Sequence, residues 1–252
     1  MTNSIYNSIL EKRRQGRHSF AVLIDPDRTD EIKLRRLAEL STKASADYFF
    51  VGGSLLTRDS LQECVNLLKQ ISNLPVVLFP GSTMQISNEA DAILFLSLIS
   101  GRNADLLIGQ QVQSAAIIRQ SDLEVIPTGY MIIEGGKRTA VEYISNTQPI
   151  PSDKEDIAAS TAMAGEMLGL KIIYLDSGSG AQQPVPAKLI STIRKNVSIP
   201  IICGGGIRTP EAAMQACEAG ADIIVVGNAI ESDQSLATDL SIAIHSVERT
   251  KV

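Results

Sequence analysis

The sequence lacks the features that mark membrane and secreted proteins. It contains no tryptophan, and aromatic residues make up only 4% of its 252 residues, so it cannot form the aromatic belt of a membrane interface. No apolar run approaches the ~20 residues that cross a bilayer, and residues 1–16 carry charges where a signal peptide has its apolar segment. We therefore expect a cytoplasmic protein that makes at most peripheral contact with membranes.

The sequence contains few cysteines and histidines, and it carries no excess of positive charge. The three cysteines, Cys64, Cys203 and Cys217, include no Cys-x-x-Cys pair, which argues against a disulfide framework or a zinc cluster. The two histidines, His18 and His245, lie outside the predicted strand ends and give little support to a histidine-based mechanism. A net charge of −5 argues against a nucleic-acid partner, because binding to a phosphate backbone needs a basic face.

Eight short apolar runs, rich in β-branched residues, alternate with helix-like segments along the chain. Each run is apolar throughout, which is typical of strands in a parallel sheet that is covered on both faces. The predicted strands are Phe20–Ile24, Tyr48–Val51, Val76–Phe79, Ala92–Leu96, Leu123–Pro127, Ile172–Leu175, Ile199–Cys203 and Ile223–Val226. The predicted helices are Asp30–Lys43, Ser60–Gln70, Ala104–Gln120, Ser152–Leu168, Pro186–Asn196, Pro210–Ala219 and Gln234–Val247.

This alternation predicts an α/β fold, a parallel (β/α)8 TIM barrel that residues 1–252 form as a single domain. A barrel of this kind typically takes about 250 residues. The alternative is an open, doubly wound sheet, which usually has fewer strands and a phosphate-binding loop after the first strand. Here the glycine-rich turns follow the sixth, seventh and eighth strands, which favours the barrel.

Three glycine-rich turns follow the last three predicted strands. In phosphate-binding barrels the loops after strands seven and eight hold the phosphate, because glycine lets backbone N–H groups converge on an anion. The glycines of a single turn are better explained by the need for a tight turn of the backbone. Three glycine-rich turns at consecutive strand ends favour a phosphate-binding site. Arg208 follows the second turn, and we expect it on the surface. The predicted phosphate site contains Ser177, Gly178, Ser179, Gly180, Gly205, Gly206, Gly227 and Asn228.

The first two predicted strands are followed by residues with hard oxygen ligands. Asp25 follows the first strand and Ser54 follows the second, so both should lie at the barrel rim opposite the glycine-rich turns. Magnesium takes one or two such protein oxygens and fills its other positions with water and substrate phosphates. The pair therefore predicts a Mg²⁺ site for a metal-bound polyphosphate. The alternative is that Asp25 caps the turn before the first helix, a role that we assign instead to Asp27.

Asp176 follows the sixth predicted strand, beside the predicted phosphate site. A carboxylate there can accept the proton of a substrate hydroxyl. Tyr174 and Tyr130 could orient the substrate, place a π face beside a developing cation, or pack at the rim. We take Asp176 and Tyr174 as the catalytic residues. Residues 128–151 exceed an ordinary connection in length, and we expect them to form a loop at the rim of the active site.

Taken together, these residues resemble the geranylgeranylglyceryl phosphate synthase family, in its longer, heptaprenylglyceryl phosphate synthase-like branch. The stretches that carry the resemblance are Leu23 to Asp27, Val51 to Ser54, Pro127 to Tyr130, Tyr174 to Gly180, Cys203 to Arg208 and Val226 to Asn228. The resemblance implies magnesium-dependent transfer of a prenyl group, expected to be geranylgeranyl, from its diphosphate to the 3-hydroxyl of sn-glycerol 1-phosphate. It implies Mg²⁺ at Asp25 and Ser54. It also implies that the glycine-rich turns bind glycerol phosphate together with Tyr174, Leu175 and Asp176.

The sequence departs from the family pattern at the acid position and agrees with one branch of it near the first strand. Many relatives carry Glu at the position of Asp176, which puts the reach of the shorter carboxylate in question. Another branch has Lys two residues before the metal-binding aspartate, where this chain has Leu23. With Leu23 the chain resembles the longer branch, and this resemblance implies a homo-oligomer, either a dimer or a hexamer. The family also implies an apolar prenyl channel, for which residues 79–84 and 93–98 are candidate linings.

Two other functions would use the same phosphate site. A phosphosugar isomerase or lyase would need an acid–base pair or a Schiff-base lysine on a strand, and no predicted strand contains lysine. A non-catalytic phosphometabolite-binding barrel would keep the glycines but has no reason to keep Asp25 and Ser54 opposite them. Magnesium-dependent consumption of a prenyl diphosphate separates the three functions.

Overall fold

Eight parallel strands close into a barrel in the order β1 to β8 in the computed structural model, which describes residues 4–233 and 235–248. The ring closes where β1 pairs with β8, with Ser19 opposite Ile223. The predicted (β/α)8 barrel is therefore confirmed. The strands are β1 (Ser19–Ile24), β2 (Tyr48–Val51), β3 (Val76–Leu78), β4 (Ala92–Leu98), β5 (Glu124–Ile132), β6 (Ile172–Asp176), β7 (Ile201–Gly204) and β8 (Ile223–Val226).

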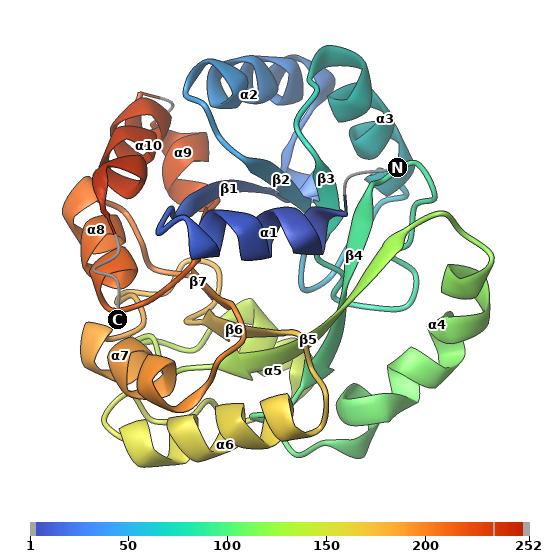
Figure 1. Ribbon diagram of the computed structural model, residues 1–252. Coiled ribbons are helices and arrows are strands. Elements are labelled where there is room, and N and C mark those ends of the chain that lie inside the picture. The colour runs from blue at the N-terminus through green and yellow to red at the C-terminus, as the bar shows by residue number, and fades with distance from the viewer. Residues whose placement is uncertain (1–3, 234, 249–252) are drawn as a thin grey trace.

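Helices surround the barrel and form its outer layer (Figure 1). In residues 4–233 and 235–248, no helix is both long and apolar enough to cross a bilayer. The predicted last helix began at Gln234, which lies outside the described residues. The helices of the outer layer and the connections are η1 (Pro26–Arg28), α2 (Glu31–Lys43), α3 (Leu61–Ile71), η2 (Asp105–Gly109), α4 (Gln110–Arg119), α5 (Ala140–Ser145), α6 (Glu155–Met167), α7 (Ala187–Asn196), α8 (Pro210–Glu218), α9 (Asn228–Ser232) and α10 (Leu236–Ser246).

The apolar core has two layers, one inside the barrel and one between the strands and the helices. Successive side chains of a strand point to opposite faces of the sheet, so neighbours such as Phe49 and Phe50 enter different layers. Because both faces are covered, the strands need apolar residues at nearly every position, which explains the continuous runs in the sequence. Cys203 lies in the outer layer, buried and free, as expected.

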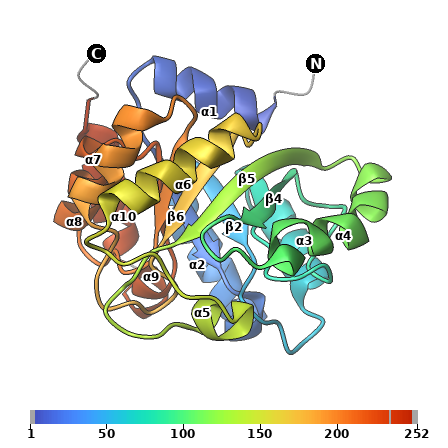
Figure 2. The same cartoon turned by 90° about the horizontal axis from the view of Figure 1, so that it is seen from below.

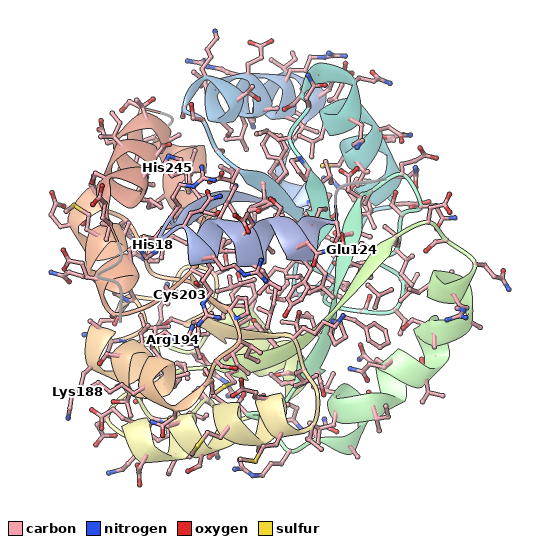
Figure 3. The ribbon with its side chains drawn as sticks, viewed as in Figure 1. His18, Glu124, Lys188, Arg194, Cys203 and His245 are labelled. Carbon is pink, nitrogen blue, oxygen red and sulfur yellow. The ribbon has the colours of Figure 1, made fainter. Side chains whose placement is uncertain are left out.

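The helix α1 (Ile5–Arg14) lies across the end of the barrel where the strands begin (Figure 1). Ile5 and Ile9 pack against the barrel interior. Glu124, at the start of β5, accepts the backbone N–H groups of Ile5 (2.5 Å) and Tyr6 (3.0 Å), and Figure 3 shows it beside this helix. A carboxylate stabilises a helix at this position because it meets the positive end of the helix dipole. The sequence analysis did not predict α1.

Strand β5 is longer than predicted, so residues 128–151 are not all loop. The strand continues past Pro127 because it pairs with β4 as far as Tyr130, which lies opposite Leu98. Proline is tolerated here because β6 has not yet begun beside it. The carbonyl of Pro127 accepts the N–H of Lys171 (2.8 Å), the residue before β6, and no ladder bond needs the missing N–H. The remainder of the segment contains helix α5.

Candidate active site

A cavity of about 200 Å³ lies at the carboxyl ends of the strands. Figure 2 shows α1 at one end of the barrel and α5 at this opposite end. Residues that follow both the early and the late strands line the cavity, among them Asp25, Ser54, Asp176, Gly205 and Gly227. The two groups of predicted site residues therefore face one common space.

The early side of the cavity, formed by the turns after β1 and β2, holds Asp25 and Ser54. The two turns are in contact, because a Cβ placed on Gly53 would lie 3.3 Å from the carboxyl carbon of Asp25. Arg28 Nε lies 3.1 Å from Asp25 Oδ2. Burial raises the pKa of Asp25, although a hydrogen bond from the N–H of Asp27 and the charge of Arg28 act in the opposite direction. This side therefore carries one half-buried carboxylate with a cation beside it.

The aspartates after β1 have different capping roles from those predicted. Asp25 caps the short turn η1, and Asp30 caps α2 by accepting the N–H of Lys33 (2.8 Å). Asp27 instead accepts the hydroxyl of Thr57 (2.8 Å). The prediction that Asp27, and not Asp25, caps the turn before the first helix is therefore wrong, because the Asp25 side chain accepts the N–H of Asp27. Asp27 ties the turn after β1 to the turn after β2.

The late side of the cavity is a surface of backbone amides. Gly205 and Gly206 follow β7 with φ angles of +79° and +71°, a region that other residues rarely adopt. A Cβ on Gly205 would lie 2.7 Å from Asp176 Oδ1, and one on Gly206 would lie 2.5 Å from the carbonyl oxygen of Gln183. Among the described residues, the N–H groups of Gly205 and Gly206 donate to no protein acceptor. Such amides at a cavity favour an anion.

The turns after β6 and β8 meet beside these amides. Ser179 Oγ donates to Asn228 Oδ1 (3.2 Å), and both residues line the cavity. Lys137 Nζ lies 3.8 Å from the position of a Cβ on Gly180, so a cation from the β5–α6 segment reaches the same turn. Sequence reasoning did not assign Lys137 to the site. The Gly-Gly-Lys-Arg run in a segment expected at the rim was the signal that could have found it.

Three predicted binding residues, Leu175, Ser177 and Gly178, do not line the cavity. Leu175 packs in the outer apolar layer, and Ser177 is fully buried. The N–H of Ser177 donates to the last carbonyl of β7 (3.1 Å), and the N–H of Gly178 donates to Asp176 Oδ1 (2.7 Å). These amides support the turn, and the residues that follow them reach the cavity.

Arg208 joins the turn after β7 to the turn after β6. Its guanidinium donates to the carbonyl oxygens of Ala181 (2.5 Å) and Gln182 (3.2 Å). The residue is exposed, as expected, yet it also lines the cavity. Arg208 therefore fixes the relative position of two turns that carry cavity amides.

Asp176, at the end of β6, forms a buried pair with Tyr130 on β5. Tyr130 Oη donates to Asp176 Oδ2 (2.5 Å). Burial raises the pKa of Asp176, although the hydrogen bonds from Tyr130 and from the Gly178 N–H act to lower it. Each carboxylate oxygen keeps a further lone pair, and the residue lines the cavity. Asp176 can therefore accept a proton from a bound hydroxyl while Tyr130 holds it in place.

Three aromatic rings meet at the same cavity. Phe79 stacks on Tyr174 with ring centroids 4.8 Å apart and an interplanar angle of 15°. Tyr130 meets both rings at steep angles, with centroids 5.6 Å from Phe79 and 5.5 Å from Tyr174. Burial raises the pKa of Tyr174 well above its ordinary value. Its hydroxyl therefore stays neutral near pH 7, so Tyr174 can orient a substrate but does not act as a base there.

A second, mostly apolar cavity of about 140 Å³ adjoins the first. The passage between them lies beside the ends of β2 to β5 and beside α5, because the residues that line both cavities are Ser54, Pro80, Gly81, Leu96, Tyr130 and Val141. Most of residues 79–84 and 93–98 line one of the two cavities, but Met84 is 90% exposed and lines neither. The apolar lining of the second cavity includes Ile86, Ile93, Leu94, Phe95, Leu96, Leu98, Leu106, Ile118, Val141 and Ile144.

The two histidines line neither cavity. His18 is buried, and its Nδ1 lies 2.7 Å from the carbonyl oxygen of Ala221. His245 Nε2 lies 3.0 Å from Asp47 Oδ2, and Figure 3 shows both histidines at the side of the barrel. Both side chains therefore have partners within the protein and lie away from the two cavities.

The chain is similar to known proteins over nearly its whole length. The pattern of the PcrB family matches residues 8–247. The geranylgeranylglyceryl phosphate synthase of Chitinophaga pinensis is 55% identical over 246 residues, which cover 98% of this chain and 98% of that protein. The protein of the same name from Spirosoma linguale is 49% identical and covers 94% of this chain and 95% of its own length.

A solved structure shares the fold and much of the sequence. It is (S)-3-O-geranylgeranylglyceryl phosphate synthase from Thermoplasma acidophilum in complex with its substrate sn-glycerol-1-phosphate. The TM-score is 0.92 at 32% identity, and the alignment covers 98% of this chain and 100% of that chain. At 32% identity the two chains are similar in sequence as well as in barrel fold.

Proposed function

The chain belongs to the PcrB family, and we propose from this membership that it transfers a prenyl group, expected to be geranylgeranyl, from its diphosphate to the 3-hydroxyl of sn-glycerol 1-phosphate. The product is an ether lipid precursor. One observation carries the proposal: a single cavity has a carboxylate and a hydroxyl on its early side and unpaired amides on its late side. The names of the relatives and the substrate in the solved relative support it.

The late side suits the phosphate of the acceptor. The amides of Gly205 and Gly206 provide two donors for one anion. The charge of Lys137, which does not line the cavity itself, lies beside the neighbouring turn at Gly180. Asp176 Oδ1 lies directly beside Gly205, so a phosphate held on these amides brings the attached glycerol close to the carboxylate. Such positioning of reactants can lower a barrier by several kcal/mol.

The early side fits a magnesium ion that arrives with the diphosphate. Across residues 4–233 and 235–248, no three His, Cys, Asp or Glu side chains are grouped to hold a metal by themselves. Mg²⁺ needs only one or two protein oxygens when substrate phosphates and water fill its other positions, and Asp25 and Ser54 offer those two. When bound, the ion would neutralise the diphosphate as a leaving group. Arg28 adds positive charge at the same side.

The transfer breaks the bond between C1 of the prenyl group and an oxygen of the diphosphate, and the bonding electrons leave with the diphosphate. The 3-hydroxyl oxygen of the acceptor forms the new bond to C1. Its proton passes to Asp176, which Tyr130 and the Gly178 N–H hold in position. A positioned proton acceptor typically contributes about 10²–10⁴-fold to the rate. The apolar second cavity takes the prenyl tail.

We also propose that the chain forms a homo-oligomer, either a dimer or a hexamer. Apolar side chains on η2 and α4 support this, because Ile108, Val112 and Ile117 are 59%, 68% and 56% exposed in the single chain, and exposed apolar patches mark association surfaces. Light scattering coupled to size-exclusion chromatography should give a mass of two or more chains, and a monomer would contradict this. A cytoplasmic location with at most peripheral membrane contact stays a prediction from the sequence.

The direct test is incubation with Mg²⁺, sn-glycerol 1-phosphate and a panel of prenyl diphosphates, with mass detection of the product. We expect prenylated glycerol phosphate, and we expect a metal chelator to abolish its formation. Absence of any prenylated product with every diphosphate would overturn the proposal. The lyase alternative lacks support, because none of the eight strands contains a lysine.

A further inference from the structure

Phe79 lies on the polar side of the passage between the two cavities. The next two residues, Pro80 and Gly81, line both cavities, and Phe79 itself lines the polar one. In the proposed function, on which this inference rests, the diphosphate binds at Asp25 and Ser54 and the tail occupies the apolar cavity. The carbon that joins the two parts, C1 of the prenyl group, therefore lies in this passage, within the same cavity wall that Phe79 and Tyr130 form.

The proposed reaction places positive charge on C1. Both electrons of the breaking C–O bond leave with the diphosphate, so C1 is electron-poor until the acceptor oxygen has bonded to it. An anionic side chain at this carbon could capture it in place of the acceptor. An aromatic face attracts a cation through the ring quadrupole and offers no competing nucleophile.

The geometry points to the ring of Phe79 as the group that stabilises the cationic C1 during transfer. Tyr174 stacks against one face of Phe79 and is only 1% exposed, whereas Phe79 is half-buried and lines the cavity. Tyr130 packs against both rings, and its hydroxyl is bonded to Asp176. Phe79 is therefore the ring of the three that is most open to the substrate. The two tyrosines fix its orientation and keep water from one side.

Replacement of Phe79 by phenylalanines with progressively more ring fluorines tests this role. Fluorine withdraws electron density from the π face but hardly changes the shape of the ring, so packing on Tyr174 is preserved. We expect kcat to fall steadily along the series, by about tenfold to thirtyfold at full fluorination, with an unchanged KM for the prenyl diphosphate. The matched control is the same series at Phe49, which is fully buried in the outer layer and should keep its kcat.

The outcomes separate this role from the proposed function. A wild-type protein that forms no prenylated glycerol phosphate overturns the proposed function and the role of Phe79 with it. An active wild type whose kcat does not depend on fluorination at Phe79 overturns only the role of the ring. Phe79→Leu gives a second check, because it keeps an apolar side chain without a π face. We expect its kcat to fall at least as far as that of the fully fluorinated protein, with an unchanged circular dichroism spectrum, and a wild-type kcat would overturn the role.

Discussion

The two ends of the barrel use the same residue types for different purposes. Where the strands begin, Asp47, Asp91 and Asp222 each directly precede a strand and accept a backbone N–H near the start of the preceding strand. Each carboxylate also pairs with a basic side chain, namely Lys12, Lys69 and Arg194 in turn. All three carboxylates therefore have hydrogen-bond and ion-pair partners within the protein. The backbone bonds join Phe20 N to Asp47 Oδ2 (2.8 Å), Val76 N to Asp91 Oδ2 (2.8 Å) and Ile201 N to Asp222 Oδ2 (2.7 Å).

Where the strands end, Asp25 and Asp176 also accept backbone N–H groups, but both line a cavity. Burial raises the pKa of both. Burial acts in the same direction on Asp47, yet His245, Lys12 and the N–H of Phe20 together lower its pKa below the ordinary value. Access to the cavity separates the two groups, because Asp25 also has an amide and the charge of Arg28 beside it. Carboxylates whose partners all belong to the protein support the fold, and those that also face the cavity are available for ligands.

Asp176→Asn should have the largest effect on activity and little effect on folding. Asparagine cannot take the proton of the acceptor hydroxyl, so we expect kcat to fall by about 10²–10⁴-fold. Steady-state kinetics measures the loss, and a thermal melt followed by circular dichroism should give a midpoint close to that of the wild type. Retention of kcat would exclude Asp176 as the proton acceptor.

Asp222→Asn, at the opposite end, should have the reverse effects. The side chain of Asp222 is 2% exposed and pairs with Arg194 at 3.3 Å, so neutralising it weakens a buried ion pair. We expect the free energy of unfolding to fall by about 3 kcal/mol, as measured by urea denaturation. At temperatures where the variant is folded, kcat should match that of the wild type. A lower kcat in the folded variant would show that Asp222 also affects activity, and would contradict the assignment of this end of the barrel to stability alone.

Tyr130→Phe removes the hydrogen bond that the Tyr130 hydroxyl donates to Asp176, and so tests how the active-site carboxylate is controlled. Without the hydroxyl, the pKa of Asp176, which burial already raises, should rise further. The ionised carboxylate is the active form, so activity is present above this pKa and is lost as the pH falls through it. The acid limb of the kcat/KM profile should therefore move to higher pH, with kcat at neutral pH lower by about tenfold. An unmoved acid limb would show that Tyr130 does not control Asp176.

Lys137→Met should have the smallest effect, confined to the acceptor. Removing this charge from beside the turn after β6 should raise the KM for sn-glycerol 1-phosphate by about fivefold. Added salt should raise the KM of the wild type toward that of the variant. Arg138→Met is the matched control, because it removes the same charge from the next residue, which lies 5.7 Å from the ring centroid of Tyr143. Equal KM values for the two variants would remove Lys137 from the site.

The barrel could be predicted because its signal is local and repeated. Each strand is buried on both faces and therefore reads as an apolar run, and each rim residue follows such a run directly. Asp25, Ser54 and Gly205 were placed at one cavity by this reasoning alone. Helix α1 escaped prediction because only Ile5 and Ile9 of it are buried, which leaves a weak apolar pattern.

The remaining features of the site depend on contacts between distant segments. The bond between Tyr130 and Asp176 requires β5 to extend past Pro127 and to pair in register with β6, and no local pattern specifies that register. The approach of Lys137 to Gly180 depends on the path of a long connection. Ser177 was assigned to the phosphate from its type, but its place at the start of the turn buries it beneath the cavity.

Calorimetric titration of sn-glycerol 1-phosphate into the Asp25→Ala variant tests the separation of the two sides most directly. The acceptor phosphate is expected on the amides of the late side, so we expect wild-type affinity in a variant that no longer turns over prenyl diphosphate. If acceptor binding were lost together with turnover, the cavity would not contain two separate anion sites, and the proposed division of the active site would be contradicted.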